Sequence, residues 1–119
     1  PPPPVYTLMN EELSWHDANA ACLAKGLQLA SVQSAAENDL LVTASAGNQV
    51  WIGGTDAFSE GTWVWSPSNT PLSYTNWHSG NPDNRDGHQD CLMLNYGNPG
   101  EWDDRYCTGE RKYICESRA

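Results

Sequence analysis

The sequence predicts an α+β domain, because helix signals are confined to the first half of the chain and strand signals dominate the second. Ser14 and Ser34 each stand at the start of a helix-forming run, and each run is followed by a glycine that favours a helix end. The second half carries short β-prone runs separated by long tracts rich in Gly, Pro, Asn and Ser.

The two helices are predicted from their ends. Ser14 caps the first helix, which is expected to stop at Gly26. The segment 34–37 is a capping box, Ser-Ala-Ala-Glu, and opens a second helix that runs to Gly47. We expect the apolar face of this helix to point toward the core, and its members are Leu40, Leu41 and Ala44.

The strands are expected to be short. Residues 5–9 alternate weakly and predict an edge strand, and four further β-prone runs follow at 50–54, 62–65, 91–94 and 112–115. Loops as long as those between them usually carry function or need covalent or metal ties.

Size and charge limit what the chain can be. Its 119 residues suit one domain at 5–119, preceded by a proline-rich tail or linker end at 1–4. The net charge of −9 argues against binding nucleic acid or an anionic membrane, and no apolar run is long enough for membrane insertion.

The four cysteines have no C-x-x-C spacing, so a zinc ribbon or a redox motif is disfavoured. An even number in a small acidic chain is typical of disulfides and of a secreted or extracellular protein. The residues alone allow three pairings and do not choose among them.

The tract from Trp77 to Cys107 is unusually rich in side-chain oxygen. The tract also contains two cysteines, and its six carboxylates and several of its amides are Asp83, Asp86, Asp90, Glu101, Asp103, Asp104, Asn81, Asn84 and Gln89. Hard oxygen ligands of this kind are those that calcium prefers, so the tract predicts a calcium site.

Fragments along nearly the whole chain resemble the C-type lectin-like domain family. They are Trp51-Ile-Gly-Gly54, Trp63-Val-Trp65, Gly80-Asn-Pro-Asp83, Gln89-Asp-Cys91, Gly100-Glu-Trp-Asp-Asp104 and Tyr113-Ile-Cys-Glu116. The resemblance implies a fold with two helices, two small antiparallel sheets and long calcium-binding loops. It also implies the disulfides Cys22–Cys115 and Cys91–Cys107, in the short form of the domain.

The same resemblance implies a principal calcium site in which two neighbouring sugar hydroxyls complete the calcium shell. Its expected ligands are Asn81, Asp83, Gln89, Asp103 and Asp104. Acid and amide alternate, with Asn81 beside Asp83 and Gln89 beside Asp103, so each sugar hydroxyl can both donate and accept a hydrogen bond. These four residues are the expected sugar-binding set.

Three positions depart from the family pattern. The first triplet is Asn-Pro-Asp, the second is Trp-Asp-Asp, and Gln89 stands where an acid is usual. The changes at Gln89 and Asp103 offset each other in charge, so calcium binding is expected to survive. The order in the first triplet favours galactose-type sugars, whereas the reversal of the second pair resembles mannose-type sites; a galactose platform on Tyr96 or Trp102 depends on the fold.

An auxiliary calcium site is implied at Asp56, Glu60, Asn84 and Asp90, with help from the Gln89 backbone. Ordinary turn acids are the alternative interpretation. A zinc site at His78 and His88 is disfavoured because no paired ligand motif accompanies them, and both histidines are better explained as surface residues.

The six tryptophans could form sugar platforms, but family positions favour the core for Trp51, for Trp63 or Trp65, and for Trp77.

No catalytic motif is present, so the chain is predicted to bind rather than catalyse. The main hypothesis is calcium-dependent glycan recognition on cells or microbes, of the kind used in innate immunity. The alternative is a lectin-like domain that binds a protein, with calcium structural or absent, and a metal-water hydrolase comes third. A single weak hexose site implies presentation as an oligomer or as a module of a larger chain.

Overall fold

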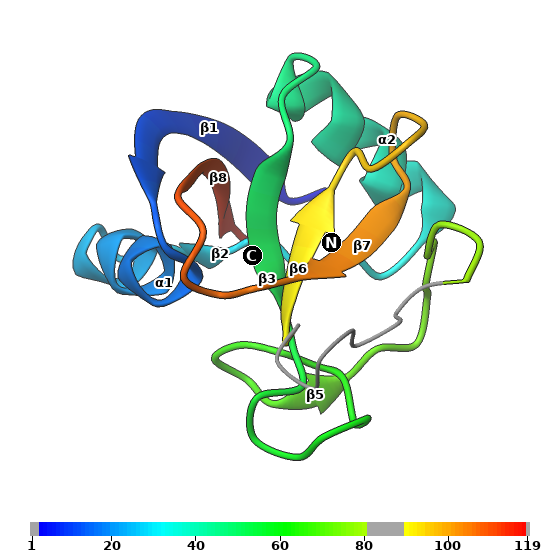
Figure 1. The fold of residues 1–119 in the computed structure, drawn as a ribbon. Coiled ribbons are helices and arrows are strands. Elements are labelled where there is room, and N and C mark those ends of the chain that lie inside the picture. The colour runs from blue at the N-terminus through cyan, green and yellow to red at the C-terminus, as the bar shows by residue number, and fades with distance from the viewer. Residues whose placement is uncertain (1–2, 81–89, 119) are drawn as a thin grey trace.

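The computed structural model describes residues 3–80 and 90–118, and in them two helices pack against a mixed β-sheet (Figure 1). The predicted α+β class is confirmed. The elements in chain order are β1 Val5–Leu13, α1 Trp15–Ala24, β2 Gln28–Leu29, α2 Ala35–Ser45, β3 Val50–Thr55, β4 Val64–Trp65, β5 Thr70–Pro71, β6 Cys91–Leu94, β7 Trp102–Arg105 and β8 Arg111–Ser117.

Both helices begin where the capping residues predict. The Ser14 and Ser34 hydroxyls accept hydrogen bonds from the backbone N–H groups three residues later, at 3.3 and 3.2 Å. The Glu37 carboxylate reaches back toward the helix start, as a capping box predicts. It accepts from the N–H of Gln33 at 2.9 Å, one residue before the Ser34 cap. Leu41 is buried in the core and Ala44 packs against it, as expected, but the expectation for Leu40 was wrong, because its side chain is 45% exposed.

The strands form one mixed sheet in the order β1-β8-β3-β4-β5, with β2 on β8 and with β6 and β7 continuing from β3. The expected pair of antiparallel sheets is joined, because β3 runs parallel to β8 at Val50–Lys112 and Trp51–Tyr113. All other pairings are antiparallel among the described strands. The central β3 is buried along its whole length.

Alternation along the central strands creates two cores, one on each face of the sheet. On one face Val50, Ile52, Leu92 and Leu94 pack with Leu41 of α2. The other face carries the intervening residues and packs against α1, and its buried members are Trp15, Ala18, Cys22, Leu29, Trp51, Cys91, Met93, Tyr113 and Cys115. In Figure 1, α1 and α2 accordingly lie on opposite sides of the strands.

Most of the tryptophans belong to these cores. Trp51, Trp65 and Trp102 are at most 1% exposed, as expected for Trp51 and for one of the pair Trp63 and Trp65. Trp63 and Trp77 are partly buried against the core, with their rings edge to face at 4.9 Å. The rings therefore stabilise the fold by apolar burial and by edge-to-face packing.

Both implied disulfides are present. Cys22–Cys115 joins α1 to β8, and Cys91–Cys107 joins the start of β6 to the segment after β7. The first closes a separation of 93 residues and the second a separation of 16. The first thus fixes the framework, and the second ties together the open end of the β6–β7 hairpin, whose strand β7 carries Asp103 and Asp104.

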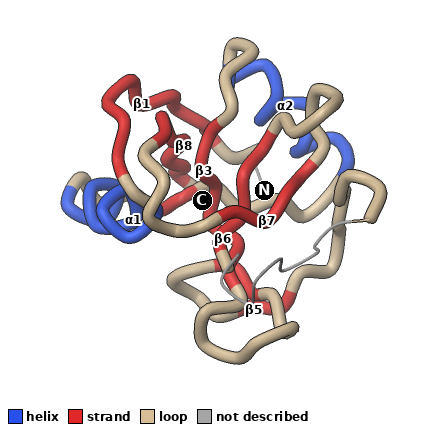
Figure 2. Tube along the Cα trace, viewed as in Figure 1, coloured by secondary structure: helices blue, strands red, loops and turns tan. Residues whose placement is uncertain are grey.

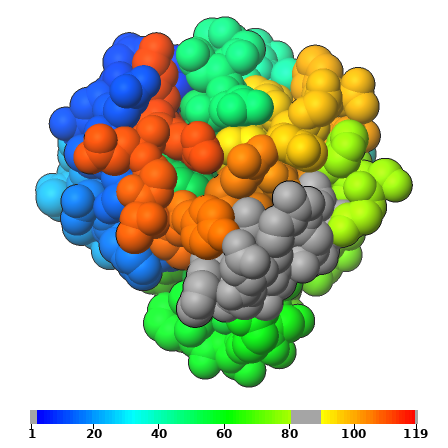
Figure 3. Space-filling view, viewed as in Figure 1, coloured from blue at the N-terminus to red at the C-terminus, as the bar shows by residue number. Residues whose placement is uncertain are grey.

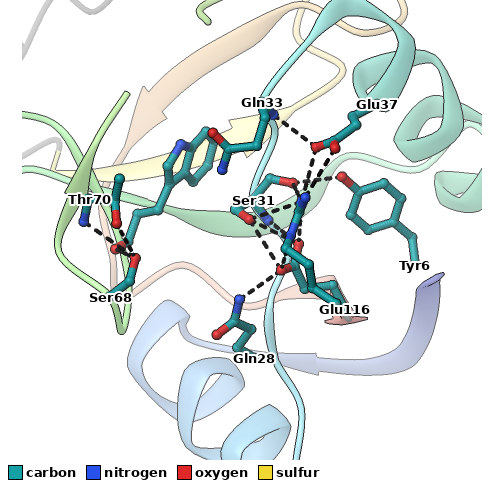
Figure 4. Close-up of polar contacts among 10 residues, drawn as sticks. Tyr6, Gln28, Ser31, Gln33, Glu37, Ser68, Thr70 and Glu116 are labelled. Atoms are coloured by element: carbon teal, nitrogen blue, oxygen red, sulfur yellow. Dashed lines mark hydrogen bonds and ion pairs between the residues drawn. The ribbon is translucent and has the colours of Figure 1, made fainter. Parts of the chain in front are cut away.

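The end of β8 holds a buried carboxylate with a full set of partners (Figure 4). Glu116 is 1% exposed and accepts hydrogen bonds from the Ser31 backbone, the Ser31 hydroxyl and Gln28 at 2.7 to 3.0 Å. Its cation is Arg118, which also donates to Glu37 at 3.0 Å. In Figure 4, Glu37 and Glu116 both lie near Ser31, and Arg118 donates to each of the two carboxylates at 3.0 Å.

The long loops gather at one end of the molecule. Figure 2 shows mostly irregular chain beyond the ends of β3 and β6, and Figure 3 shows the segment after β3 protruding there. Among the described residues, no helix is both long and apolar enough to cross a bilayer.

Candidate metal and sugar site

The register of two antiparallel strands brings Asp56 and Asp90 together. β3 ends at Thr55, which lies opposite Cys91 at the start of β6. The Asp56 N–H and the Thr55 hydroxyl both donate to the Asp90 carbonyl, at 3.1 and 2.6 Å. Residues 34 positions apart in sequence are therefore held side by side by the last hydrogen bonds of the sheet.

The loop after β3 returns Glu60 to the same place. Ser59 and Thr62 close two successive turns, and the Gly61 N–H donates to Asp56 Oδ2 at 2.9 Å. Gly61 has a φ of +81°, a conformation that residues with a side chain rarely adopt. One carboxylate oxygen from each of Asp56, Glu60 and Asp90 lies within 4.8 Å of the others.

We call this group of three acids the Asp56–Glu60–Asp90 cluster. Two of its carboxylate oxygens are buried without a hydrogen-bond partner among the described residues. Asp56 is 2% exposed, and the Oδ1 atoms of both Asp56 and Asp90 are buried without a hydrogen bond among the described residues. Burial raises the pKa of Asp56 to about 7; the Gly61 N–H opposes this, and Asp90 and Glu60 add to it. Gathered carboxylates with unused oxygens fit a calcium ion, which takes six to eight oxygen ligands.

The cluster contains three of the four residues predicted for the auxiliary site. The fourth, Asn84, and the Gln89 backbone lie outside the described residues, as do Asn81, Asp83 and Gln89 of the principal site.

The described part of the predicted principal site is Asp103 and Asp104 on β7. Pairing of β7 with β6 places them opposite Met93 and Leu92, and they are 6% and 0% exposed. Burial raises the pKa of Asp103; the Arg105 guanidinium lowers it and the Asp104 carboxylate raises it further. Two adjacent buried acids on one strand again suit a divalent cation.

The chain leading toward the undescribed residues 81–89 runs beside this strand. Trp102 donates its N–H to the Asn76 carbonyl, and its own carbonyl accepts from His78 N–H at 2.9 Å. His78 Nδ1 lies 2.7 Å from Glu101 Oε1, a contact that lowers the pKa of Glu101. In the described chain His78 thus contacts a single carboxylate and is not a member of the three-acid cluster. His88, the other histidine considered for zinc, lies outside the described residues.

One charged contact at the site was not anticipated from the sequence. Arg105 forms an ion pair with Asp103 through Nε, and its guanidinium lies over the Tyr96 ring at 4.8 Å from the centroid. The available signal was spacing, because residues two apart on a strand point to the same face. The contact with Tyr96 depends on how the turn after β6 folds back.

Comparison with known proteins decides the family. The model of the Lectin C-type domain matches residues 11–117. The chain belongs to the C-type lectin domain family.

Its relatives are similar over almost the full chain. The salivary C-type lectin 2 of Aedes albopictus is 34% identical over 126 residues, covering 95% of this chain and 83% of that protein. The carbohydrate-recognition domain of the mouse scavenger receptor C-type lectin superposes with a TM-score of 0.89 at 31% identity, covering 98% of this chain and 90% of that one.

A third relative is a different kind of molecule. The herring type II antifreeze protein superposes with a TM-score of 0.90 at 28% identity, covering 99% of this chain and 93% of that one. The fold alone therefore does not determine the ligand, and the argument for function must come from the site.

Proposed function

We propose that this C-type lectin domain binds sugars in a calcium-dependent manner. The observation that carries the proposal is the Asp56–Glu60–Asp90 cluster, in which two buried carboxylate oxygens lack a described hydrogen-bond partner. Leaving such charges uncompensated is costly, so a cation is expected to complete the cluster. A protein that used this fold without calcium would have little reason to bury these acids.

The sugar is proposed to bind at the neighbouring principal site, through Asn81, Asp83, Gln89, Asp103 and Asp104. Calcium, when bound there, would supply free coordination positions for two vicinal sugar hydroxyls. The chain's own part is to offer carboxylates that accept from those hydroxyls and amides that donate to them. Asp103 and Asp104 support this role by their place on β7, and the other three rest on sequence resemblance.

We further propose a preference for galactose-type over mannose-type sugars, from the amide-first order of Asn81 and Asp83. Trp102 is excluded as an aromatic platform because it is fully buried. Tyr96 is partly exposed, but its ring face is covered by Arg105. Any platform effect is therefore expected to be small.

The test is a glycan array screened with millimolar calcium and again with a chelator, on the wild type and on Asp104→Asn. Asp104 is buried, so the neutral isostere is preferred to alanine. The matched control is Asp39→Asn, which removes the same charge from an exposed position on α2. We expect binding that requires calcium, that free galactose inhibits better than mannose, and that Asp104→Asn abolishes while Asp39→Asn does not.

Other outcomes would identify the alternative. Binding to a protein partner that is indifferent to chelator and to monosaccharides would favour a lectin-like domain with structural calcium or none. Turnover of a glycoside would be needed to revive a hydrolase, and we propose that the domain is not an enzyme.

The weak affinity expected of a single sugar site indicates how the domain is presented to its ligands. We propose an extracellular domain, consistent with its two disulfides, that is presented as an oligomer or within a longer chain so that several sites act together. Glycans on cells or microbes are the proposed partners.

A further inference from the structure

A row of contacting side chains lies beside β7 and includes the predicted ligand Asp103. His78 meets Tyr96 edge to face, with ring centroids 4.9 Å apart, and the Arg105 guanidinium covers the Tyr96 ring. Arg105 then pairs with Asp103. We call these four residues the Tyr96 ledge: His78, Tyr96, Asp103 and Arg105.

The ledge is held in place from beneath. A Cβ at Gly97 would lie 2.8 Å from His78, so the absence of a side chain there lets the histidine approach the turn. His78 is fixed in turn by Glu101 at 2.7 Å. The arginine is consequently pre-positioned on a supported ring, which limits the side-chain entropy lost when it binds a ligand.

Arg105 adds hydrogen-bond donors beside Asp103, in addition to the amide expected from Gln89. An ionised carboxylate accepts hydrogen bonds but has no N–H to donate, so Asp103 cannot act as both acceptor and donor toward a sugar hydroxyl. The ion pair joins Arg105 Nε to Asp103 Oδ2, and a guanidinium carries further N–H donors on its two terminal nitrogens. An acceptor and a donor thus stand side by side, as they do within a single amide group.

We propose that Arg105 is a sugar-contacting residue, and that the Asp103–Arg105 pair performs the combined acceptor and donor role of one amide side chain. The inference rests on the proposed sugar-binding function and adds a residue to it. Because the pair is neutral as a unit, the ligand it suits is an uncharged hexose with a free hydroxyl. The Arg105 side chain is 32% exposed and Asp103 only 8%, so the arginine lies on the outer, ligand-accessible side.

The experiment separates binding of calcium from binding of sugar. Calcium affinity is measured by calorimetry, and affinities for methyl α-galactoside and methyl α-mannoside by NMR titration at saturating calcium. The variants are Arg105→Gln, which removes the charge and the fork, and Arg105→Lys, which retains only the charge. Lys25→Gln, at the exposed end of α1, is the control for the loss of one positive charge.

For Arg105→Gln we expect sugar affinity to fall about tenfold, the scale of one charge-assisted hydrogen bond. Calcium affinity should stay the same or rise, because a cation next to Asp103 has been removed. Arg105→Lys should fall in between, since a lysine ammonium lacks the planar fork. Lys25→Gln should match the wild type in both titrations.

Two results would overturn the proposal. Unchanged sugar affinity in Arg105→Gln would show that the guanidinium does not touch the ligand. A parallel fall in calcium and sugar affinity would show that Arg105 acts only by holding Asp103. If the wild type binds calcium but neither glycoside, the proposed function itself fails, and that result is distinct because it precedes any comparison of variants.

Discussion

Buried carboxylates at the two ends of this molecule are treated in opposite ways. In the framework, Glu116 is 1% exposed and receives hydrogen bonds from Gln28 and Ser31 and an ion pair from Arg118. At the loop end, Asp56 is 2% exposed, yet its Oδ1 has no partner among the described residues, and neither has Asp90 Oδ1.

The contrast separates acids that hold the fold from acids that await a ligand. A guanidinium supplied by the chain neutralises the first kind permanently. The second kind raises the free energy of the cation-free protein and returns that energy when a cation binds. Burial alone does not distinguish Glu116 from Asp56 and Asp90; the difference is that the latter two each have a buried oxygen without a hydrogen-bond partner among the described residues.

The largest effect is expected from the framework disulfide. Replacing Cys22 and Cys115 by alanine should cost about 4 to 5 kcal/mol of unfolding free energy in the chain-entropy model, since the closed loop spans 93 residues. The same change at Cys91 and Cys107, which are 16 residues apart, should cost about 3 kcal/mol and also weaken calcium binding. Urea unfolding with and without calcium measures both. If the two double variants lost the same unfolding free energy and bound calcium equally well, the framework and the loop end would not differ in this respect.

Calcium itself should produce the next effect. At a concentration one hundred times its Kd, it should stabilise the wild type by about 2.7 kcal/mol for one site. Asp90→Asn should lose most of the stabilisation that calcium bound at the Asp56–Glu60–Asp90 cluster provides. Glu116→Gln should lower stability but keep that increment, because its network is at the other end. Thermal unfolding over a calcium titration tests this, and a reduced increment in Glu116→Gln would contradict it.

Removing the framework cation should be moderately costly. Arg118→Ala leaves Glu116 and Glu37 without their guanidinium and should lower the unfolding free energy by about 2 kcal/mol, less than for a fully buried pair because Arg118 is 28% exposed. Lys25→Ala serves as the exposed control and should stay within about 0.5 kcal/mol. Urea unfolding of calcium-free protein at pH 7 is the measurement.

The same variant should change the response to acid. Hydrogen bonding to Arg118 holds the pKa of Glu37 below its usual value of 4.5, so this contribution is complete above pH 4.5 and is lost as the pH falls through the folded pKa. The difference between wild type and Arg118→Ala should therefore shrink as the pH falls below 4.5. A difference that stays constant to pH 3 would assign the effect to packing of the arginine stem.

The smallest effect has the opposite sign. Asp56→Asn should stabilise the calcium-free protein at pH 8 by about 1 kcal/mol, because the buried carboxylate is ionised there against its raised pKa of about 7. The same variant should lose stabilisation by calcium. Asp39→Asn, on exposed α2, should do neither, and destabilisation by Asp56→Asn in chelator would show that the cluster already has its partners.

Much of the fold could be predicted because its signals are local. The serine caps of both helices, the β-prone runs that form β3 and β6, and the family-implied disulfides were all confirmed. The outward turn of Leu40 was missed because its helix buries a narrower apolar stripe than the sequence suggests. The joining of the two sheets was missed because a parallel contact between β3 and β8 has no local signal.

The sequence by itself provided the acids and amides on which the proposed ligand chemistry rests, since these side chains and their spacing can be read directly from the chain. The tertiary structure decided which acids share a site and which receive a cation from the chain. Asp56 meets Asp90, Arg105 meets Tyr96, and Arg118 meets Glu37 only through strand register and returning turns. The first and last of these contacts join residues far apart in sequence and depend on how the whole sheet is assembled, whereas the second depends on the turn between β6 and β7.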